Sequence, residues 1–455
     1  MLSIKNISLR IGFMKKKFYT MVAFALLFLN VISVNAAMFY EEPLNSAAVY
    51  VVDKSNGIPI VEKNIHEKRS PASLTKMMTF IIAFENCVDA EQTKVKVKKE
   101  VLDLVDPESS GVKLKNGEEI TLQNLFNCML ICSSGDAAMV IADYVGGGSI
   151  ENFVNKMNEK ALQLGCADTH FANPDGIYNQ NQYSTAEDIY KITRYAMNIP
   201  SFIDIVSKSE CSVFGDERDP LITTNKMIDK KRGGEYYYPY VKGVKTGYIQ
   251  EAGRCLASYA QKNDNIYIGV VMGGPVEDEN GDKIEKNLAM IDTKKIYTWA
   301  FDNLKTIKLY PKNMPVAEVN LEYVWNHDKL LLTPDSDFSL KLPYSPKKED
   351  ISIKVNTPNL VEAPVQKGET IGRAEVFYRD QKVGEFNVVS DSSFKKNYFM
   401  LIFKNLKKIV QSPLFKIVLS IAVIFLIVYI FMIVKENKKR KKRNKIKKFP
   451  KNYRY

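Results

Sequence analysis

A run of eighteen residues without a charge, from Ile417 to Val434, constrains this 455-residue chain more than any other feature. As a helix the run is roughly 27 Å long, close to the hydrocarbon thickness of a bilayer, about 30 Å. Twelve lysines and arginines and one glutamate follow in residues 435–455. An apolar helix followed directly by so many charges is not expected to be buried inside a domain. We therefore expect a transmembrane helix over 414–434 and a basic cytoplasmic tail over 435–455, which places the preceding body outside the cell membrane.

The N-terminal residues point to export. Three lysines, at 15–17, precede an apolar run over 21–34, and small residues stand just before Ala37. This pattern is typical of a secretory signal peptide, predicted over 1–36, and Met14 is an alternative start. At the other end, residues 392–413 mix apolar and lysine side chains before the span. They form either an amphipathic interfacial helix or a plain stalk.

The charge is unevenly distributed. The net charge of +12 comes entirely from the two ends, and residues 37–434 carry a net charge of −4. A mildly acidic body argues against a nucleic-acid surface, whereas the basic tail fits the anionic head groups of membrane lipids. With 45% hydrophobic residues, the body is long enough to enclose a large core in two or three domains.

The pattern of the body predicts an α/β (α+β) domain over 37–305 and a small all-β sandwich over 306–391. A hairpin is expected around Asn56–Gly57, with strands over 253–261 and 265–273 and a helix over 284–304. These strands form a central antiparallel sheet with helices against it. Three helix starts are signalled by caps, namely Thr121, Ser149, and Ser184 with Glu187. After 306, alternation with a period of two indicates short strands at 317–321, 338–342, 351–355, 374–378 and 382–389.

Cysteine and histidine usage limits the chemistry. The six cysteines share no repeating spacing, so we expect buried thiols in preference to disulfides. Only three histidines occur, and no G-x-S-x-G motif is present. A serine nucleophile in this chain would therefore need a lysine as its base.

One segment offers that pair. Ser73 and Lys76 are three residues apart at a predicted helix start, where positions i and i+3 share a face. Ser70 as N-cap and Pro71 at the first helical position would set Ser73 near the positive end of the helix dipole. An ordinary capped core helix is the alternative.

Two further segments carry hydroxyls beside a lysine or a helix start. Lys245, Thr246, Gly247 and Tyr248 lie on an expected strand edge, where a surface turn is the alternative. Ser133, in the sequence Ser133-Ser134-Gly135, falls in a loop between two helices, where simple N-capping is the alternative.

In this order the three segments resemble the motif set of the penicillin-recognising serine enzymes. The wording P-A-S-L-T-K-M-M-T, N-P-D-G-I, G-V-K-T-G-Y and E-A-G-R-C-L is similar to that of the low-molecular-mass D-alanyl-D-alanine carboxypeptidases. The resemblance covers roughly 40–410 and implies a β-lactamase/transpeptidase-like catalytic domain, a β-sandwich and membrane attachment.

The resemblance also implies roles. Ser73 is the acyl-ester nucleophile, Lys76 the general base and Ser133 a proton relay. Lys245, Thr246, Gly247 and Tyr248 bind the substrate, a peptidoglycan stem peptide that loses its terminal D-alanine, and β-lactams inhibit covalently. No cofactor, metal or nucleic acid is implied.

Two departures from the family pattern stand out. Gly135 occupies the place of the usual Asn in the middle motif, unless Asp136 or another side chain substitutes. The stretch E-K-N-L-A-M-I-D before the last helix lacks the Arg that many members carry. The alternatives are therefore a catalytically weakened peptidoglycan-binding membrane protein, or a β-lactamase in which Glu159 belongs to an E-x-x-L-N-like sequence.

Overall fold

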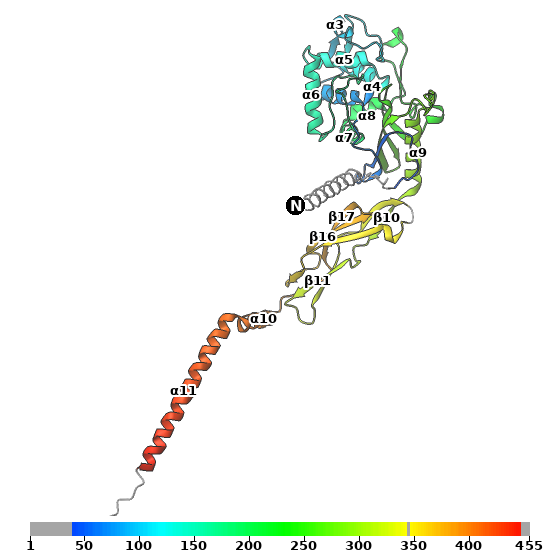
Figure 1. Ribbon diagram of the computed structural model, residues 1–455. Coiled ribbons are helices and arrows are strands. Elements are labelled where there is room, and N and C mark those ends of the chain that lie inside the picture. The colour runs from blue at the N-terminus through cyan, green and yellow to red at the C-terminus, as the bar shows by residue number, and fades with distance from the viewer. Residues whose placement is uncertain (1–38, 344–345, 447–455) are drawn as a thin grey trace, which may run out of the picture. The chain divides into compact units, whose positions relative to one another are not determined.

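The computed structural model describes residues 39–343 and 346–446 (Figure 1). The predicted signal peptide lies outside these residues. The described chain forms two compact units, one reaching to Lys305 and the other containing Thr306–Lys341 and the residues from Pro346 onward; the first unit also includes the short segment that begins at Leu342.

A five-stranded antiparallel sheet forms the centre of the first unit. Its order is β2-β1-β9-β8-β7, which brings the first two strands of the chain beside the last three of this unit. The strands are β1 (Ala48–Asp53), β2 (Pro59–Lys63), β7 (Val241–Ile249), β8 (Gly253–Lys262) and β9 (Asn265–Gly274). The predicted hairpin and the central sheet are confirmed, and β7 is an edge strand.

Helices cover both faces of this sheet. On one face α7 packs against β1 and β9, and the other helices gather around it; on the opposite face α9 packs against β8 and β9 (Figure 1). The helices are α2 (Lys76–Glu85), α3 (Lys99–Leu102), α4 (Leu122–Ile131), α5 (Gly135–Val145), α6 (Ile150–Gln163), α7 (Ala186–Ala196), α8 (Pro200–Val206) and α9 (Leu288–Asn303). The short elements are η1 (Ala72–Thr75), η2 (Gly215–Glu217), η3 (Gly234–Tyr236), β3 (Lys94–Lys96), β4 (Glu119–Thr121), β5 (Glu210–Cys211) and β6 (Leu221–Ile222).

Two of the predicted helix caps are confirmed and one is wrong. The Thr121 and Ser149 side chains accept from main-chain N–H groups in the first turns of α4 and α6. For α7 the cap is Thr185, one residue later than predicted. Ser184 exchanges two main-chain hydrogen bonds with Arg69, both 2.9 Å long. This bridge holds Ser184 in extended backbone and leaves the cap position to its neighbour.

The predicted all-β region is confirmed, with three strands that the alternation did not reveal. Its main sheet has the order β14-β16-β17-β12-β11-β15, beside a two-stranded sheet of β10 and β13. The Phe338 ring of β13 lies 4.9 Å from the Phe386 ring of β17, between the two sheets. The elements are β10 (Leu304–Tyr310), β11 (Ala317–Glu322), β12 (Lys329–Pro334), β13 (Phe338–Pro343), η4 (Lys348–Asp350), β14 (Ile351–Asn356), β15 (Leu360–Glu362), β16 (Thr370–Tyr378) and β17 (Gln381–Ser390). The unpredicted strands are β10, β12 and β15.

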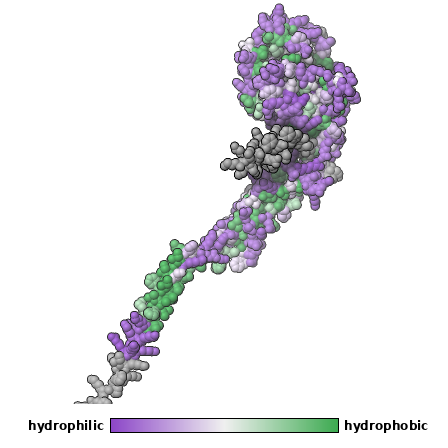
Figure 2. Space-filling view, viewed as in Figure 1, coloured by the Kyte–Doolittle hydropathy of each residue, from purple (hydrophilic) through white to green (hydrophobic). Residues whose placement is uncertain are grey.

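Two helices follow the sandwich, α10 (Tyr398–Gln411) and α11 (Pro413–Ile446). Residues 413–443 have a mean hydropathy of 3.3 in their most apolar window, and none of that window is buried. Figure 2 shows this helix as a continuous hydrophobic band that gives way to a hydrophilic end. Within the described residues it is the one helix long and apolar enough to cross a membrane.

All six cysteines are unpaired, as predicted. Three of them, Cys128, Cys166 and Cys255, are buried in the core of the first unit. Burial raises the pKa of the Cys166 thiol to about 12, because a thiolate is poorly solvated there. These thiols therefore act as small apolar side chains.

Candidate active site

Ser73 and Lys76 meet where η1 passes into α2. Residues three apart eclipse one another in a 3₁₀ turn, and the Lys76 Nζ donates to the Ser73 Oγ at 3.0 Å. The Lys76 side chain is buried, and its Nζ also donates to the main-chain carbonyl of Asp175. The structure thus places an amine beside the hydroxyl, shielded from solvent.

The predicted N-cap at Ser70 is wrong. Pro71 occupies the cap position of η1, without a side-chain cap bond. Ala72 then adopts a left-handed backbone with a φ of 46°, which turns the chain immediately before Ser73. The Ser70 hydroxyl is therefore directed elsewhere; its oxygen is buried and has no hydrogen-bond partner among the described residues.

Backbone strain and close packing concentrate around the Ser73 turn. A left-handed conformation costs a non-glycine residue roughly 1–2 kcal/mol, and both Ala72 and Ser133, with φ of 66°, adopt it. Strain of this kind gathers at functional sites. On β7, a β-carbon at Gly247 would lie 3.1 Å from the Ala72 Cβ and 3.2 Å from the Ser73 N. Glycine therefore allows the edge strand to approach the turn that carries the hydroxyl.

The third predicted segment faces the same turn from β7. Lys245 is 1% exposed, and its Nζ donates to the Ser133 Oγ at 2.8 Å and to the Thr246 carbonyl at 2.9 Å. The Thr246 Oγ1 lies 2.5 Å from the Thr224 Oγ1. Tyr248 is largely exposed, with 57% of its surface accessible. The structure thus joins the loop after α4 to the edge strand through Lys245.

The two buried lysines have lowered pKa values. Burial, opposed by the nearby Asp175 and Asp136 carboxylates, lowers the pKa of Lys76 to about 8. Burial and the neighbouring Lys76 charge hold the pKa of Lys245 well below its ordinary range. Two ammonium groups this close, and out of water, disfavour double protonation. The pair therefore readily gives up one of its protons.

The Asp136 side chain, one alternative substitute for the missing amide, binds neighbouring main-chain N–H groups. Ser134 caps α5, its Oγ accepting from the Ala137 N–H at 3.2 Å. The Asp136 carboxylate accepts from the N–H groups of Val112, at 3.3 Å, and Leu114, at 3.0 Å. Asp136 therefore holds the main chain of a neighbouring loop.

The segment before α9 contains an arginine contact from another strand. Arg254 of β8 donates to the main-chain carbonyl of Lys286, and its second terminal nitrogen lies 3.5 Å from that of Glu285. Arg254 therefore stabilises this segment. Glu159, the residue of the β-lactamase alternative, is exposed on α6, whereas the lysines of the site are buried.

Sequence reasoning missed two residues of the site, Asp175 and Thr224. Asp175 belongs to N-P-D-G, which as a sequence indicates only a turn. In the structure its carbonyl accepts from Lys76, and Gly176, at a φ of 87°, leaves room for the Ser73 turn. The N-P-D-G sequence was the available signal, but a turn sequence does not reveal that its main-chain carbonyl binds a lysine.

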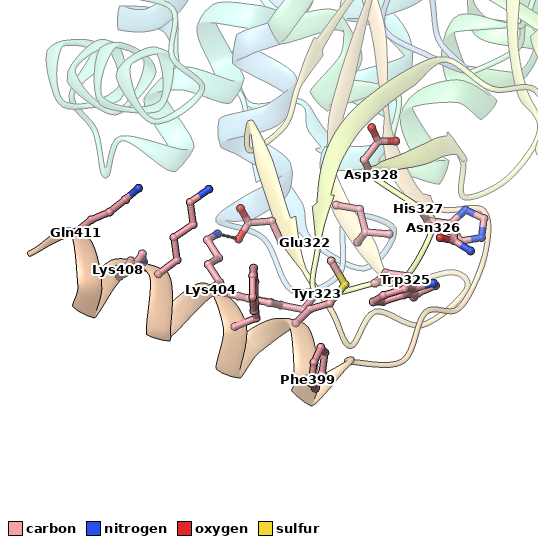
Figure 3. Close-up of a pocket in the computed structure, with 15 residues that line it drawn as sticks. Glu322, Tyr323, Trp325, Asn326, His327, Asp328, Phe399, Lys404, Lys408 and Gln411 are labelled. Atoms are coloured by element: carbon pink, nitrogen blue, oxygen red, sulfur yellow. Dashed lines mark hydrogen bonds and ion pairs between the residues drawn. The ribbon is translucent and has the colours of Figure 1, made fainter.

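A large open groove lies in the second unit rather than at the lysine cluster. It has a volume of about 1070 Å³ and runs between residues 321–328 and α10. Figure 3 shows Trp325 and Phe399 at its apolar end and Lys404 and Lys408 along the helix. The Lys404 ammonium pairs with the Glu322 carboxylate. The groove contains none of the predicted catalytic residues.

Comparison with known proteins agrees with this geometry. A family model described as D-alanyl-D-alanine carboxypeptidase matches residues 35–276, and one described as penicillin-binding protein 5, C-terminal domain, matches residues 304–396. D-alanyl-D-alanine carboxypeptidase DacF of Bacillus subtilis is 29% identical over 360 residues, covering 78% of this chain and 87% of its own. DacC of Escherichia coli is 30% identical over 344 residues, covering 73% of this chain and 80% of its own.

Solved structures show the same fold. Penicillin-binding protein 5 of Haemophilus influenzae matches with a TM-score of 0.56 at 23% identity, over 78% of this chain and 99% of its own. The Streptomyces K15 DD-transpeptidase matches with a TM-score of 0.51 at 28% identity, over 58% of this chain and 99% of its own. With its serine and lysine cluster, its helix-covered sheet and its β-rich second unit, the chain belongs to the D-alanyl-D-alanine carboxypeptidase family of serine peptidases.

Proposed function

We propose that Ser73 is the nucleophile of this carboxypeptidase and that its substrate is the stem pentapeptide of peptidoglycan. The Ser73 Oγ attacks the carbonyl carbon between the last two D-alanines, and its proton passes to the neutral amine of Lys76. The C–N bond then breaks, the leaving amine takes a proton through Ser133, and an acyl-ester on Ser73 remains. Water hydrolyses that ester and regenerates the hydroxyl.

The observation that carries this proposal is the 3.0 Å contact of the Lys76 Nζ with the Ser73 Oγ inside a buried site. A lysine accepts a proton only when neutral, and burial brings the pKa of Lys76 to about 8. The arriving substrate carboxylate favours the protonated form of Lys245, and the charge there in turn favours a neutral Lys76. Substrate binding thus prepares the base.

Lys245 and Thr246 form the proposed carboxylate site. Both lie on the edge strand that faces the Ser73 turn, and Lys245 links to Ser133 at 2.8 Å. The oxyanion of the tetrahedral intermediate is assigned to the main-chain N–H groups of Ser73 and Tyr248. Gly247, which precedes Tyr248 on β7, lets this strand approach the Ser73 turn closely enough for both N–H groups to reach one oxyanion.

The test is release of D-alanine from a pentapeptide by the fragment 37–393, together with labelling by a fluorescent penicillin. We expect both activities in the natural sequence and neither in Ser73→Ala. Penicillin labelling without D-alanine release favours the weakened-site alternative, for which the glycine at position 135 is the specific reason. Rapid turnover of a chromogenic β-lactam favours a β-lactamase. Absence of both activities contradicts the enzymatic proposal.

We assign residues 37–305 to the peptidase domain, 306–391 to the β-sandwich, 392–413 to a juxtamembrane segment and 414–434 to a single membrane span. The apolar stretch of α11 and the basic residues that follow that stretch support this division. In this topology the tail over 435–455 is cytoplasmic and contacts anionic lipid. An epitope at the C-terminus is then reached by antibody only after cells are permeabilised; access in intact cells contradicts the orientation.

The juxtamembrane helix α10 is proposed to lie in the bilayer interface. Phe399, Phe403 and Leu406 are each more than half exposed, and lysines flank this apolar face. Trp325, across the groove, is 60% exposed, and tryptophan favours the interface. Because α11 begins directly after this helix, the face meets lipid. The fragment 37–411 should therefore bind vesicles with anionic lipid, and the fragment 37–393 should not.

A further inference from the structure

The space where a side chain at position 135 would lie is occupied by Ser109, from another segment of the chain. A β-carbon built on Gly135 would overlap the Ser109 Oγ, and would lie 3.0 Å from the Ser109 Cβ and 3.2 Å from the Asp175 Oδ2. The position is therefore occupied, although the residue at 135 has no side chain. In this arrangement a side chain at 135 requires the Ser109 hydroxyl to move.

Several bonds hold the segment around Ser109 in place. The Gly135 N–H donates to the Ser110 carbonyl at 2.6 Å. The next residue, Asp136, accepts from the N–H groups of Val112 and Leu114, which lie two and four residues after Ser110. The Ser109 N–H donates to the Asp106 carbonyl at 2.9 Å. The approach of Ser109 to Gly135 is thus built by main-chain contacts on either side of it.

The Ser109 hydroxyl connects to the base of the site. Its Oγ donates to the Asp175 Oδ2 at 3.2 Å, and Asp175 is 4% exposed. The main-chain carbonyl of the same Asp175 accepts from Lys76. A continuous path therefore runs from Ser109 through Asp175 and Lys76 to the Ser73 hydroxyl.

We infer that Ser109 is a positioning residue that takes the place of the missing amide, fixing Asp175 and through it the base Lys76. This inference rests on the proposed function of Lys76. If so, the glycine at 135 does not leave the site incomplete, because a serine from a different segment occupies the space of the missing amide.

The first test replaces the hydroxyl. In Ser109→Ala the loss of one hydrogen bond to a carboxylate should lower kcat for D-alanine release about tenfold, with KM unchanged, because Lys76 acts in the chemical step. The matched control is Ser110→Ala, an exposed neighbour whose main-chain carbonyl, and not its side chain, accepts from Gly135. An unchanged kcat in Ser109→Ala, or an equal loss in the control, overturns the inference.

The second test exchanges the two positions. Gly135→Asn alone should slow acylation by a fluorescent penicillin about a hundredfold, since the amide displaces Ser109 and with it the local geometry. Adding Ser109→Gly should restore the rate to within about tenfold of the natural sequence. A fully active Gly135→Asn, or a double variant no faster than the single one, overturns the inference.

If Gly135→Asn does not fold, the inference is decided by the kcat of Ser109→Ala alone. The thermal midpoints of Ser109→Ala and Ser110→Ala must then agree, so that a lower kcat does not reflect unfolding. If the natural sequence releases no D-alanine and Ser73→Ala is still labelled, the proposed function has failed. An active natural enzyme with an indifferent Ser109→Ala contradicts only the inference.

Discussion

Replacing Lys76 by methionine should make the protein inactive and, relative to the natural sequence, more stable at neutral pH than at alkaline pH. Burial of its ammonium group lowers the pKa of Lys76 from 10.5 to about 8. In the unfolded chain the same group titrates near 10.4. Between these values the unfolded state binds more protons than the folded one, so the free energy of unfolding of the natural protein rises with pH.

The size of the effect follows from the two pKa values. At pH 7 the unfavourable protonation of buried Lys76 costs about 3 kcal/mol, and at pH 10 it costs about 1 kcal/mol, so the difference is about 2 kcal/mol. The loss of the hydrogen bonds to Asp175 and Ser73 changes the free energy of unfolding of Lys76→Met by the same amount at both pH values. It therefore cancels in the difference between them. Removing the Lys76 charge also lessens the lowering of the pKa of Lys245, which stabilises the variant at neutral pH as well.

Thermal unfolding of the fragment 37–393 at pH 7 and pH 10 measures this difference. Relative to the natural sequence, the midpoint of Lys76→Met should fall by roughly 3–4 °C between pH 7 and pH 10. Lys96→Met, at an exposed position of β3, is the control and should follow the natural sequence. A midpoint difference for Lys76→Met that is independent of pH would refute the account of a buried base with a lowered pKa.

Three further outcomes are expected. Gly247→Ala should slow acylation about a hundredfold, because its methyl group would press on Ala72 and separate β7 from the Ser73 turn; penicillin labelling over time measures this. Asp292→Ala should lower the free energy of unfolding by about 3 kcal/mol, since the buried carboxylate accepts at 2.8 Å from the Ser46 N–H; thermal unfolding checks it. All six cysteines should react with a thiol reagent in denaturant without prior reduction, and fewer than six reactive thiols would show a disulfide.

Much of the fold was predictable because it depends on local patterns. The Asn-Gly turn, the caps at Thr121 and Ser149 and the uncharged run before the basic tail each specify an element directly. The strand β15 was missed because it has three residues, too few to show alternation. The S-x-x-E pattern indicates a cap at Ser184, and the cap lies instead at Thr185 because Ser184 forms a main-chain bridge with Arg69 that no sequence pattern shows.

The site was predictable where its residues are close in sequence. Ser73 and Lys76 share one turn, so their contact needs no tertiary information. Lys245 reaches Ser133 from 112 residues away, and only the resemblance to a family brought the two together beforehand. Ser109 carries no motif at all, and its relation to Gly135 arises from loop packing, which is invisible in a linear pattern.

The most direct test of the central claim is the site of acylation. The fragment 37–393 is incubated with a β-lactam, its intact mass is measured, and the modified peptide is mapped after digestion. We predict one acyl group per chain, carried on Ser73, and no mass shift in Ser73→Ala. Acylation at any other residue, or an unmodified natural protein, would contradict the account of Ser73 and Lys76 as nucleophile and base.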